Sequence, residues 1–550
     1  MNNKKEPSAW AALSSEEETI VKKLTALILC LMLCVGLMPA MAEGNAVRIA
    51  FGYDPNTLDY AMSNLDTANF ILTHIAETLL VQDATGAYVP GIAESYEKSE
   101  DGRVWTFKIK EGLTYQDGET AITAADLFYA AKRLLDPAAP KDNAIFWLAN
   151  SEAYYAGEVS FDEVGVKLID DYTIEYTFTN PTYESTFTGT SLFAPLEEAY
   201  VEAGGEIYGS SSYLPLANGP FMVEEWLDDA SVTLVRNPAY QNKDSITVDE
   251  IDITLNASAD VVLDMMLAGE LDIASFNDPL MLQTLEDSGF VKGESYSSTY
   301  QGLNLRGGGR NEETGKFLSN ANFRRAINTA LDREALAASV MTGYTPTWRL
   351  SAPGELAYTA NPDYRAWDTT ANVELANQYL NAAMEELGVT KDQIPVIQLM
   401  CYESQGAINS LSAVQDQLRV NLGLETEITP CTIQVMISNA MSGNYDLWWG
   451  GNEASVPDAC ESYLDGFRSN SGMPLRGYAD PEFDALYEAA VSSATLEERL
   501  NNYAKLEAYF CENAMCIILG WDAHYIVTAP GTAGYYLLDG GRINVSQLTK

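Results

Sequence analysis

Residues 105–137 read WTFKIKEGLTYQDGETAITAADLFYAAKRLLDP, and their pattern indicates local structure clearly. From 104 to 110, large apolar residues alternate with threonine and lysine, as expected for a strand with one buried face. Thr123 and Asp126 then have the spacing of a capping box at the start of a helix. Apolar residues recur behind them at helical spacing until Pro137, which has no backbone N–H to donate. This stretch therefore predicts a strand, a turn and an amphipathic helix.

Similar patterns of strands and helices alternate along the rest of the chain. Ile174, Tyr176 and Phe178 predict a second half-buried strand. Residues 322–331 and 495–510 carry apolar residues at helical spacing. Mixed strands and helices in this order predict α/β lobes. With 550 residues, of which 47% are hydrophobic, the chain can form at least two lobes with packed cores.

The N-terminal region has the pattern of a secretory signal peptide. Lys22-Lys23 precedes an apolar run over residues 24–38, and the small-residue triplet Ala40-Met41-Ala42 follows. A membrane-spanning helix needs about 20 apolar residues, and this run is shorter. We therefore interpret residues 1–42 as an N-terminal extension and a signal peptide that is cleaved after Ala42. The mature protein is then expected in the periplasm, at the cell surface or outside the cell.

The chain has 78 acidic side chains and 32 Lys or Arg side chains, which gives a formal net charge of −46. This balance argues against nucleic acid as a partner, because its phosphates are bound by Lys and Arg. One interpretation of the charge is an acidic cleft for cationic ligands, and the other is a solvated surface that keeps an exported protein soluble. We favour the surface, since net charge governs solubility rather than any single site.

Cysteine and histidine are too few and too scattered for the common catalytic or metal-binding motifs. Five cysteines follow Ala42, an odd number without a CxxC pair or a Cys/His cluster. Only His74 and His524 are present, no HExxH or GxSxG motif occurs, and we interpret both histidines as structural. Arg306-Gly-Gly-Gly-Arg310 lacks the spacing of a phosphate-binding loop, so we expect a flexible connection there. The sequence thus predicts no catalytic residue, no metal ligand and no cofactor, with a secreted hydrolase built on two carboxylates as the rival class.

The stretch 105–137 resembles the signature of the oligopeptide- and dipeptide-binding family of extracytoplasmic solute receptors, bacterial solute-binding family 5. That signature contains Trp-Thr-Phe, a basic strand, Asp-Gly, Thr-Ala-x-Asp and a helix ending in Arg-x-x-x-Pro, and the chain matches it in order. Other segments match in the family's order, so the resemblance spans roughly residues 47–540. These segments include Asn218-Gly-Pro-Phe221, Arg236-Asn-Pro-Ala-Tyr240, Gly269-Glu-Leu-Asp-Ile273 and Asp480-Pro-Glu-Phe-Asp-Ala-Leu486.

The resemblance implies a two-lobed, type II periplasmic-binding-protein-like fold of the α/β class, with an extra domain and mixed sheets flanked by helices. It implies lobe I from residues 43–60, 214–305 and 522–550, the extra domain from 61–213, and lobe II from 306–521. It also implies a monomeric receptor, not an enzyme, that captures a peptide or another small solute between its lobes. The permease subunits of an ABC transporter would be its partner in the membrane. Relatives that take sugars or metal chelates make those ligands the alternatives.

Two segments are candidates for the ligand site, and the first is residues 298–304. It resembles the family's strand at the hinge, whose backbone runs beside the ligand, and this implies contacts from Tyr300, Gln301 and Asn304. A peptide carries its own backbone donors and acceptors, so a strand edge in the cleft can bind it whatever its side chains are. Composition alone explains Tyr300 equally well as a core aromatic of a strand.

The second candidate is residues 445–453, Tyr-Asp-Leu-Trp-Trp-Gly-Gly-Asn-Glu. The family has Trp-x-x-Asp here, and its aspartate pairs with the α-ammonium group of the ligand. Aligned on Trp449, this chain has Asn452 in that place, with Glu453 as the adjacent carboxylate. An amide cannot neutralise a buried ammonium, and an unpaired buried charge costs several kcal/mol. The twin tryptophans would also suit a stacked sugar, or they are ordinary core aromatics. The candidate ligand residues of this segment are Trp448, Trp449, Gly451, Asn452 and Glu453.

Overall fold

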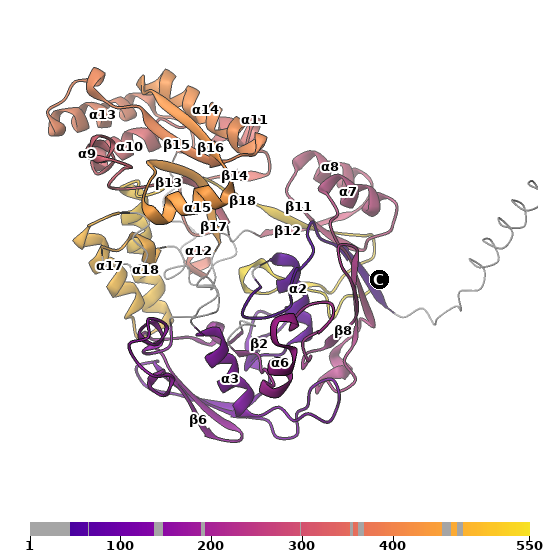
Figure 1. Ribbon diagram of the computed structural model, residues 1–550. Helices are drawn as coiled ribbons and strands as arrows, with labels where there is room; N and C mark the ends of the chain where they lie inside the picture. The colour runs from indigo at the N-terminus through magenta and orange to yellow at the C-terminus, as the bar shows by residue number, and fades with distance from the viewer. Residues whose placement is uncertain are drawn as a thin grey trace, which may run out of the picture. The chain divides into compact units, whose positions relative to one another are not determined.

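The structure is a computed structural model that describes residues 45–63, 65–136, 147–188, 193–296, 299–352, 356–360, 368–453, 464–469 and 477–550 (Figure 1). Apart from the first two, these residues belong to the unit Val47–Lys550. The predicted signal peptide and its cleavage site lie outside the described residues. None of the helices in these ranges combines the length and the apolar character that a membrane span requires.

A four-stranded antiparallel sheet contains the first predicted strand. Its order is β4-β5-β7-β6, and its strands are β4 (Ala93–Lys98), β5 (Val104–Ile109), β7 (Thr173–Thr177) and β6 (Val166–Asp170). Trp105 and Phe107 of β5 are fully buried in the core shared with helix α3 (Ala124–Leu134). At the start of α3, the backbone N–H of Thr123 donates to Asp126 Oδ2 at 2.7 Å, within the predicted capping box. The strand and the helix predicted from this stretch are therefore confirmed.

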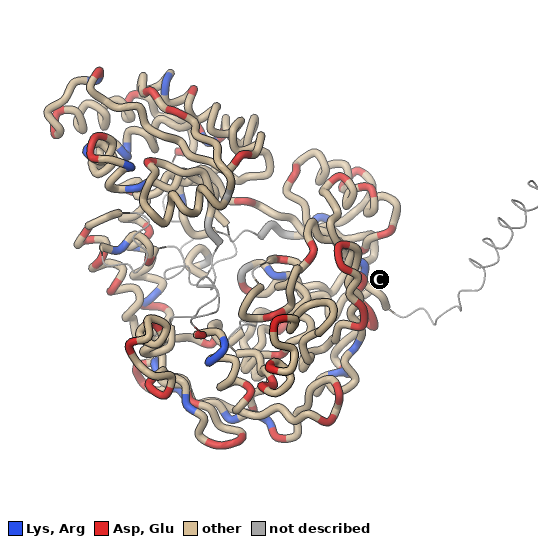
Figure 2. The backbone as a smooth tube through the Cα atoms, viewed as in Figure 1, with Lys and Arg blue, Asp and Glu red and all other residues tan. Residues whose placement is uncertain are grey.

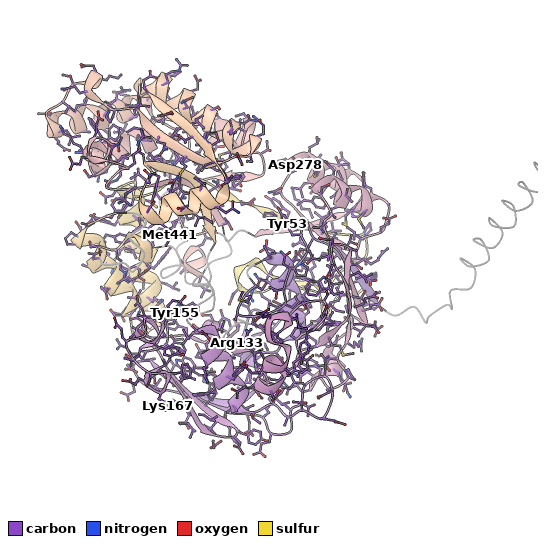
Figure 3. The ribbon with its side chains drawn as sticks, viewed as in Figure 1. Tyr53, Arg133, Tyr155, Lys167, Asp278 and Met441 are labelled. Carbon is purple, nitrogen blue, oxygen red and sulfur yellow. The ribbon has the colours of Figure 1, made fainter. Side chains whose placement is uncertain are left out.

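Two further sheets, of four and three strands, each contain strands from distant parts of the chain. The first has the order β1-β10-β9-β8, with β1 (Ala46–Ala50), β10 (Glu250–Thr254), β9 (Ser231–Arg236) and β8 (Phe221–Leu227). The second has the order β11-β19-β12, with β11 (Ile273–Phe276), β19 (His524–Thr528) and β12 (Val291–Tyr296), and packs against α7 (Ala259–Leu267) and α8 (Pro279–Asp287). Asp278 caps α8 by accepting the N–H groups of Leu280 and Met281 (Figure 3). The chain thus returns from its C-terminal part to pair with strands from its middle.

The largest sheet has six strands and helices on both faces. Its order is β14-β18-β13-β17-β15-β16, with β14 (Tyr344–Pro346), β18 (Ile517–Asp522), β13 (Thr299–Leu305), β17 (Leu447–Glu453), β15 (Ile397–Tyr402) and β16 (Thr426–Cys431). Ile517 packs with α10 (Ala321–Thr329), α13 (Val373–Leu387) and α14 (Gln405–Leu422), whereas Ile518 packs with α17 (Pro481–Val491) and α18 (Leu496–Glu512). Consecutive strand residues point to opposite faces, so the sheet is covered on both sides, as in α/β folds.

The chain passes twice between the three-stranded and the six-stranded sheet. β12 precedes β13, and β18 is separated from β19 by Ala523 alone. β12 pairs with β19 and β13 pairs with β18, so the two crossings are antiparallel partners. The predicted boundary between lobe I and lobe II, after residue 305, puts β13 in lobe I. In the structure, β13 hydrogen-bonds within the six-stranded sheet, together with strands predicted for lobe II.

Acidic residues are spread along the whole described part of the chain (Figure 2). This distribution supports the solvated-surface interpretation of the net charge of −46. The buried carboxylate of Asp59 has a cationic partner in Arg133 (Figure 3), as burial of a charge requires.

His74 ties helix α2 (Asp66–Ile75) to the C-terminal segment. Its ring is fully buried, with Nδ1 2.8 Å from the carbonyl oxygen of Phe70 and Nε2 accepting the N–H of Val545 at 3.1 Å. These partners require a neutral ring protonated on Nδ1. Burial lowers the pKa of His74 to about 4, because the charged ring would lose its hydration. The structural role expected for this histidine agrees with these contacts.

We expect His74 to make the protein less stable as the pH falls below about 6.5. Below this pH the histidine of the unfolded chain is protonated, whereas the buried ring of the folded chain stays neutral down to about pH 4. The free energy of unfolding therefore falls by up to about 3 kcal/mol across this range. Urea unfolding of the wild type and of His74→Phe at pH 7 and pH 5 measures the effect. The wild type should lose about 2 kcal/mol more than the variant between these pH values. Equal losses in the two proteins would contradict a neutral buried ring.

Candidate solute-binding site

The two candidate segments form neighbouring strands of the six-stranded sheet. β13 and β17 pair in antiparallel fashion along their whole length. The pairs that contain predicted residues are Tyr300 with Asn452, Gln301 with Gly451, Thr299 with Glu453, Leu303 with Trp449 and Asn304 with Trp448. The structure therefore brings all eight predicted site residues onto one strand pair, although the two segments are far apart in sequence.

The side chains of Tyr300 and Asn304 belong to the interior. Tyr300 is 1% exposed and its hydroxyl donates to Asn304 Oδ1 at 2.9 Å. Asn304 is fully buried and its Nδ2 donates to the carbonyl oxygen of Gly450 at 2.9 Å. These contacts favour the core interpretation of Tyr300, and they leave the Asn304 side chain no access to a solute. The Asn304 side chain therefore has a structural role, and the predicted contact of this residue with a ligand stays a prediction.

The two tryptophans point to opposite faces of the sheet. Trp449 is 4% exposed and packs in the core with Leu303. Its Nε1 donates to the side-chain oxygen of Gln301 at 3.1 Å, in the amide orientation that satisfies both groups. Trp448 is only partly buried, and its ring lies so close to Gly450 that a Cβ there would be 2.2 Å from it. Of the pair, Trp448 is the tryptophan with accessible surface.

The backbone of β13 is not available to an added strand, contrary to the expectation for residues 298–304. One edge pairs with β17 from Thr299 to Leu305, and the other pairs with β18 from Tyr300 to Leu303. β17 differs, because β15 pairs with its second edge only at Leu447 and Trp448. From there to Glu453, none of the described strands pairs with this edge of β17.

Gly450 and Gly451 lie on this part of β17, and at each of them another group of the chain stands where a Cβ would be. The C=O and N–H of Gly450 are bonded to the side chains of Asn304 and Gln301. A Cβ at Gly451 would be 2.0 Å from the carbonyl oxygen of Tyr300, so only glycine fits the spacing of β13 and β17 at this point. Sequence reasoning named Gly451 but missed the open edge. The glycine pair after the two tryptophans was the signal that could have indicated it. The backbones of Asn452 and Glu453 continue this edge, while their side chains lie outside the described part of the structure.

The loop after β13 is anchored, which corrects the expected flexible connection at Arg306-Gly-Gly-Gly-Arg310. Asp446, directly before β17, is fully buried and accepts the backbone N–H of Arg310 at 2.8 Å and that of Gln398 at 3.0 Å. The guanidinium of Arg310 also lies 3.3 Å from Asp446 Oδ2. This bonding holds the start of β17 against the end of β13.

Polar side chains join the two sheets near the crossing strands. Asn277 Nδ2 donates to Asp522 Oδ1 at 3.1 Å, and His524 Nε2 lies 3.1 Å from Asp522 Oδ2. Ser275 Oγ lies 3.2 Å from His524 Nδ1. The partner His524 helps keep the pKa of Asp522 low despite its burial. Within the described ranges, no three His, Cys, Asp or Glu side chains converge as metal ligands.

Comparison with known proteins assigns the chain to a family. The family model of the bacterial extracellular solute-binding proteins, family 5, matches residues 87–474. The chain belongs to this family. The resemblance seen in the sequence is thereby confirmed, and the family consists of binding proteins that act outside the cytoplasm.

Relatives of this solute-binding protein match over most of its length. The oligopeptide-binding protein OppA of Bacillus subtilis is 27% identical over 471 residues, which is 84% of each chain. The periplasmic oligopeptide-binding protein OppA of Escherichia coli is 24% identical over 475 residues, again 84% of each chain. Among solved structures, the pheromone receptor PrgZ has a TM-score of 0.73 at 21% identity, covering 92% of this chain and 99% of its own. Peptide-bound OppA of Listeria monocytogenes has a TM-score of 0.72 at 22% identity and the same coverage. These likenesses confirm the predicted two-lobed α/β fold.

We expect Gly451→Ala to destabilise this solute-binding protein by about 1–3 kcal/mol, because the new Cβ would overlap the carbonyl oxygen of Tyr300 and push β13 from β17. Urea unfolding measures the change. Gly308→Ala is the matched control, since the nearest atom to a Cβ there is 3.9 Å away. If both variants unfold like the wild type, the close pairing of β13 and β17 at Gly451 is contradicted.

Proposed function

We propose that this family 5 protein is the peptide-capturing receptor of an ABC importer. The observation that carries the proposal is the open edge of β17 after Trp448, which lies beside the partly buried ring of Trp448. An extended peptide can add to such an edge through its own N–H and C=O groups, with affinity that depends little on its side chains. Relatives named as oligopeptide-binding proteins favour a peptide over the sugar and metal-chelate alternatives and over a hydrolase.

In this proposal, Gly450 and Gly451 let the peptide backbone approach β17, and Trp448 forms an apolar wall. Asn452 accepts a hydrogen bond from the peptide's ammonium group, and Glu453 supplies the neutralising charge that an amide lacks. Peptide contacts with both lobes stabilise the closed form to the extent that the peptide binds it more tightly than the open form. Tyr300, Gln301, Asn304 and Trp449 support β17 from behind.

The proposed lobes follow the sheets. Lobe I consists of residues 43–60, the part from 214 to β12, and 522–550, with the extra domain at 61–213. Lobe II runs from β13 to residue 521. The protein is exported as a monomer after cleavage behind Ala42, has no catalytic role, and passes its peptide unchanged to permease subunits in the membrane.

Backbone recognition predicts that N-methylation of the peptide weakens binding more than changes of its side chains. Calorimetry with a tetrapeptide, its alanine-substituted versions and a version N-methylated at alternate residues tests this. Each lost backbone hydrogen bond should lower affinity about fivefold, since a neutral hydrogen bond is worth about 1 kcal/mol. If no peptide binds, or if methylation has no effect, addition to the edge of β17 is rejected.

The proposed clamp is the pairing of Asn452 and Glu453 with the ammonium group of the peptide. It predicts that Glu453→Gln weakens the binding of a peptide with a free amino terminus about tenfold or more, because a charge-assisted hydrogen bond is worth about 1.5–3 kcal/mol. An N-acetylated peptide should bind both forms equally. Glu427→Gln, which removes an exposed charge from β16 of the same sheet, is the matched control. Equal affinity of wild type and Glu453→Gln for the free peptide would remove Glu453 from the clamp and leave peptide capture itself to the methylation test.

A further inference from the structure

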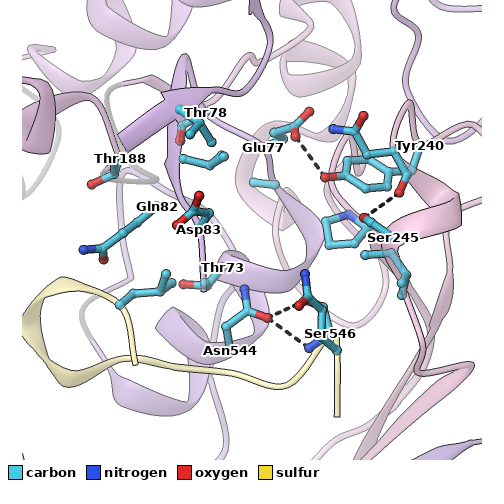
Figure 4. A pocket seen from close by; sticks show the side chains of 18 of the residues that line it. Thr73, Glu77, Thr78, Gln82, Asp83, Thr188, Tyr240, Ser245, Asn544 and Ser546 are labelled. Carbon is cyan, nitrogen blue, oxygen red and sulfur yellow. Dashed lines mark hydrogen bonds between the residues drawn. The ribbon is translucent and has the colours of Figure 1, made fainter. Parts of the chain in front are cut away.

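A cavity of about 530 Å³ lies in a part of the molecule that the peptide proposal does not use (Figure 4). Its walls come from residues 73–90, 220–246 and 536–547, together with Thr188. None of these residues belongs to the six-stranded sheet that carries β13 and β17. Small-molecule sites are typically about 300–1,000 Å³ in volume, so the cavity is large enough for a ligand of its own.

The cavity wall is mainly neutral and polar. Hydroxyl and amide side chains from several segments of the chain line the cavity (Figure 4). Among them are Thr73, Gln82, Asn242, Ser245, Asn544 and Gln547. Tyr240 and Tyr536 add half-buried rings whose faces are apolar. A ligand that fits must therefore have many hydrogen-bonding groups and some apolar surface.

Of the three carboxylates in the wall, Glu77 and Asp83 are bonded to protein groups, whereas Asp244 is exposed. Glu77 is 3% exposed, and it accepts from the Tyr240 hydroxyl at 2.9 Å and from the side-chain amide of Gln241. Asp83 accepts from the backbone N–H and the hydroxyl of Thr85 and from the backbone N–H of Ala87. Glu77 and Asp83 hold the wall in place. Together with Asp244 they outnumber Arg542, the basic side chain of the wall, and this balance disfavours an anionic ligand.

Three neutral groups of the wall have hydrogen-bonding capacity to spare. The hydroxyl of Thr73 is buried and has no partner in the described structure. Asn544 accepts the N–H and the hydroxyl of Ser546 with its oxygen, at 2.9 and 2.7 Å, but its Nδ2 meets no acceptor among the described residues. The Gln547 side chain has no partner in that part of the chain either. Buried polar groups normally have partners, so the buried Thr73 hydroxyl calls for a partner supplied from outside. The amides of Asn544 and of the half-buried Gln547 can bond to the same ligand.

We propose that this cavity binds a neutral sugar, a mono- or disaccharide. A sugar hydroxyl both donates and accepts, so it can serve the Thr73 hydroxyl, the Asn544 amide nitrogen and the Gln547 amide alike. The C–H faces of a pyranose ring fit against the rings of Tyr240 and Tyr536. An ammonium ligand would need carboxylate oxygens, and those of Glu77 and Asp83 are bonded to Tyr240, Gln241 and the turn at Asp83, which leaves the exposed Asp244 alone. The proposal goes beyond peptide capture and does not depend on it.

Calorimetry of the protein purified after export, with glucose and maltose as probes, tests the proposal. At least one sugar should bind, and a saturating tetrapeptide should leave its affinity unchanged, because the cavity shares no residue with β17. Thr73→Val and Asn544→Asp should each weaken the sugar about three- to tenfold, as expected for the loss of one neutral hydrogen bond. Asn544→Asp keeps the oxygen that Ser546 uses, and it replaces the donor by a second, negatively charged acceptor oxygen.

Thr426→Val is the matched control, because the Thr426 hydroxyl is also buried without a partner in the described structure but lies on β16, away from the cavity. It should leave sugar affinity unchanged. Failure of both sugars to bind at millimolar concentration would overturn the proposal, as would tighter binding of putrescine or citrate. Equal sugar affinity of the wild type, Thr73→Val and Asn544→Asp would overturn the assignment to this cavity.

Discussion

Strand β13 is hydrogen-bonded on both edges directly after the chain has left another sheet, and the surroundings of the candidate site follow from this constraint. Its neighbours β17 and β18 approach closely because glycines stand where a side chain would collide. A Cβ at Gly302 would lie 2.4 Å from the carbonyl oxygen of Ile517, and one at Gly451 would lie 2.0 Å from that of Tyr300. With β13 paired on both edges from Tyr300 to Leu303, the proposed peptide site uses the second edge of β17.

Buried polar side chains fix these strands from outside the ladder. Arg333 is 1% exposed and lacks a carboxylate partner in any described ion pair, yet its Nε donates to the carbonyl oxygens of Ile518 at 2.8 Å and Thr347 at 3.1 Å. Burial lowers the pKa of Arg333 to about 9. At the start of β17, Asp446 likewise accepts hydrogen bonds from the backbones of Arg310 and Gln398. These bonds hold the strands beside the open edge in place, which favours binding by reducing the ordering cost.

The two proposed sites use the same kind of chemistry in separate parts of the molecule. Backbone groups and glycines would recognise a peptide at β17, while neutral hydroxyls and amides would recognise a sugar in the cavity. Neither site relies on the net charge of −46, which is spread over the surface. His74 also holds part of the cavity wall in place. Its ring joins α2 to Val545, and residues next to each of them, Thr73 and Asn544, line the cavity.

The sequence alone determined those features that depend on neighbouring residues. The alternation over residues 104–110, the Thr123–Asp126 capping box and the helical stripe behind it are local, so strand, helix and family could be recognised from them. The two candidate segments could also be named, but not their pairing, because pairing depends on contacts between residues about 150 positions apart. An alternating pattern buries one face and does not reveal whether a helix covers the other, so only the tertiary structure showed that Tyr300, Asn304 and Trp449 are interior. The cavity was likewise invisible, since its walls meet only when distant segments fold together.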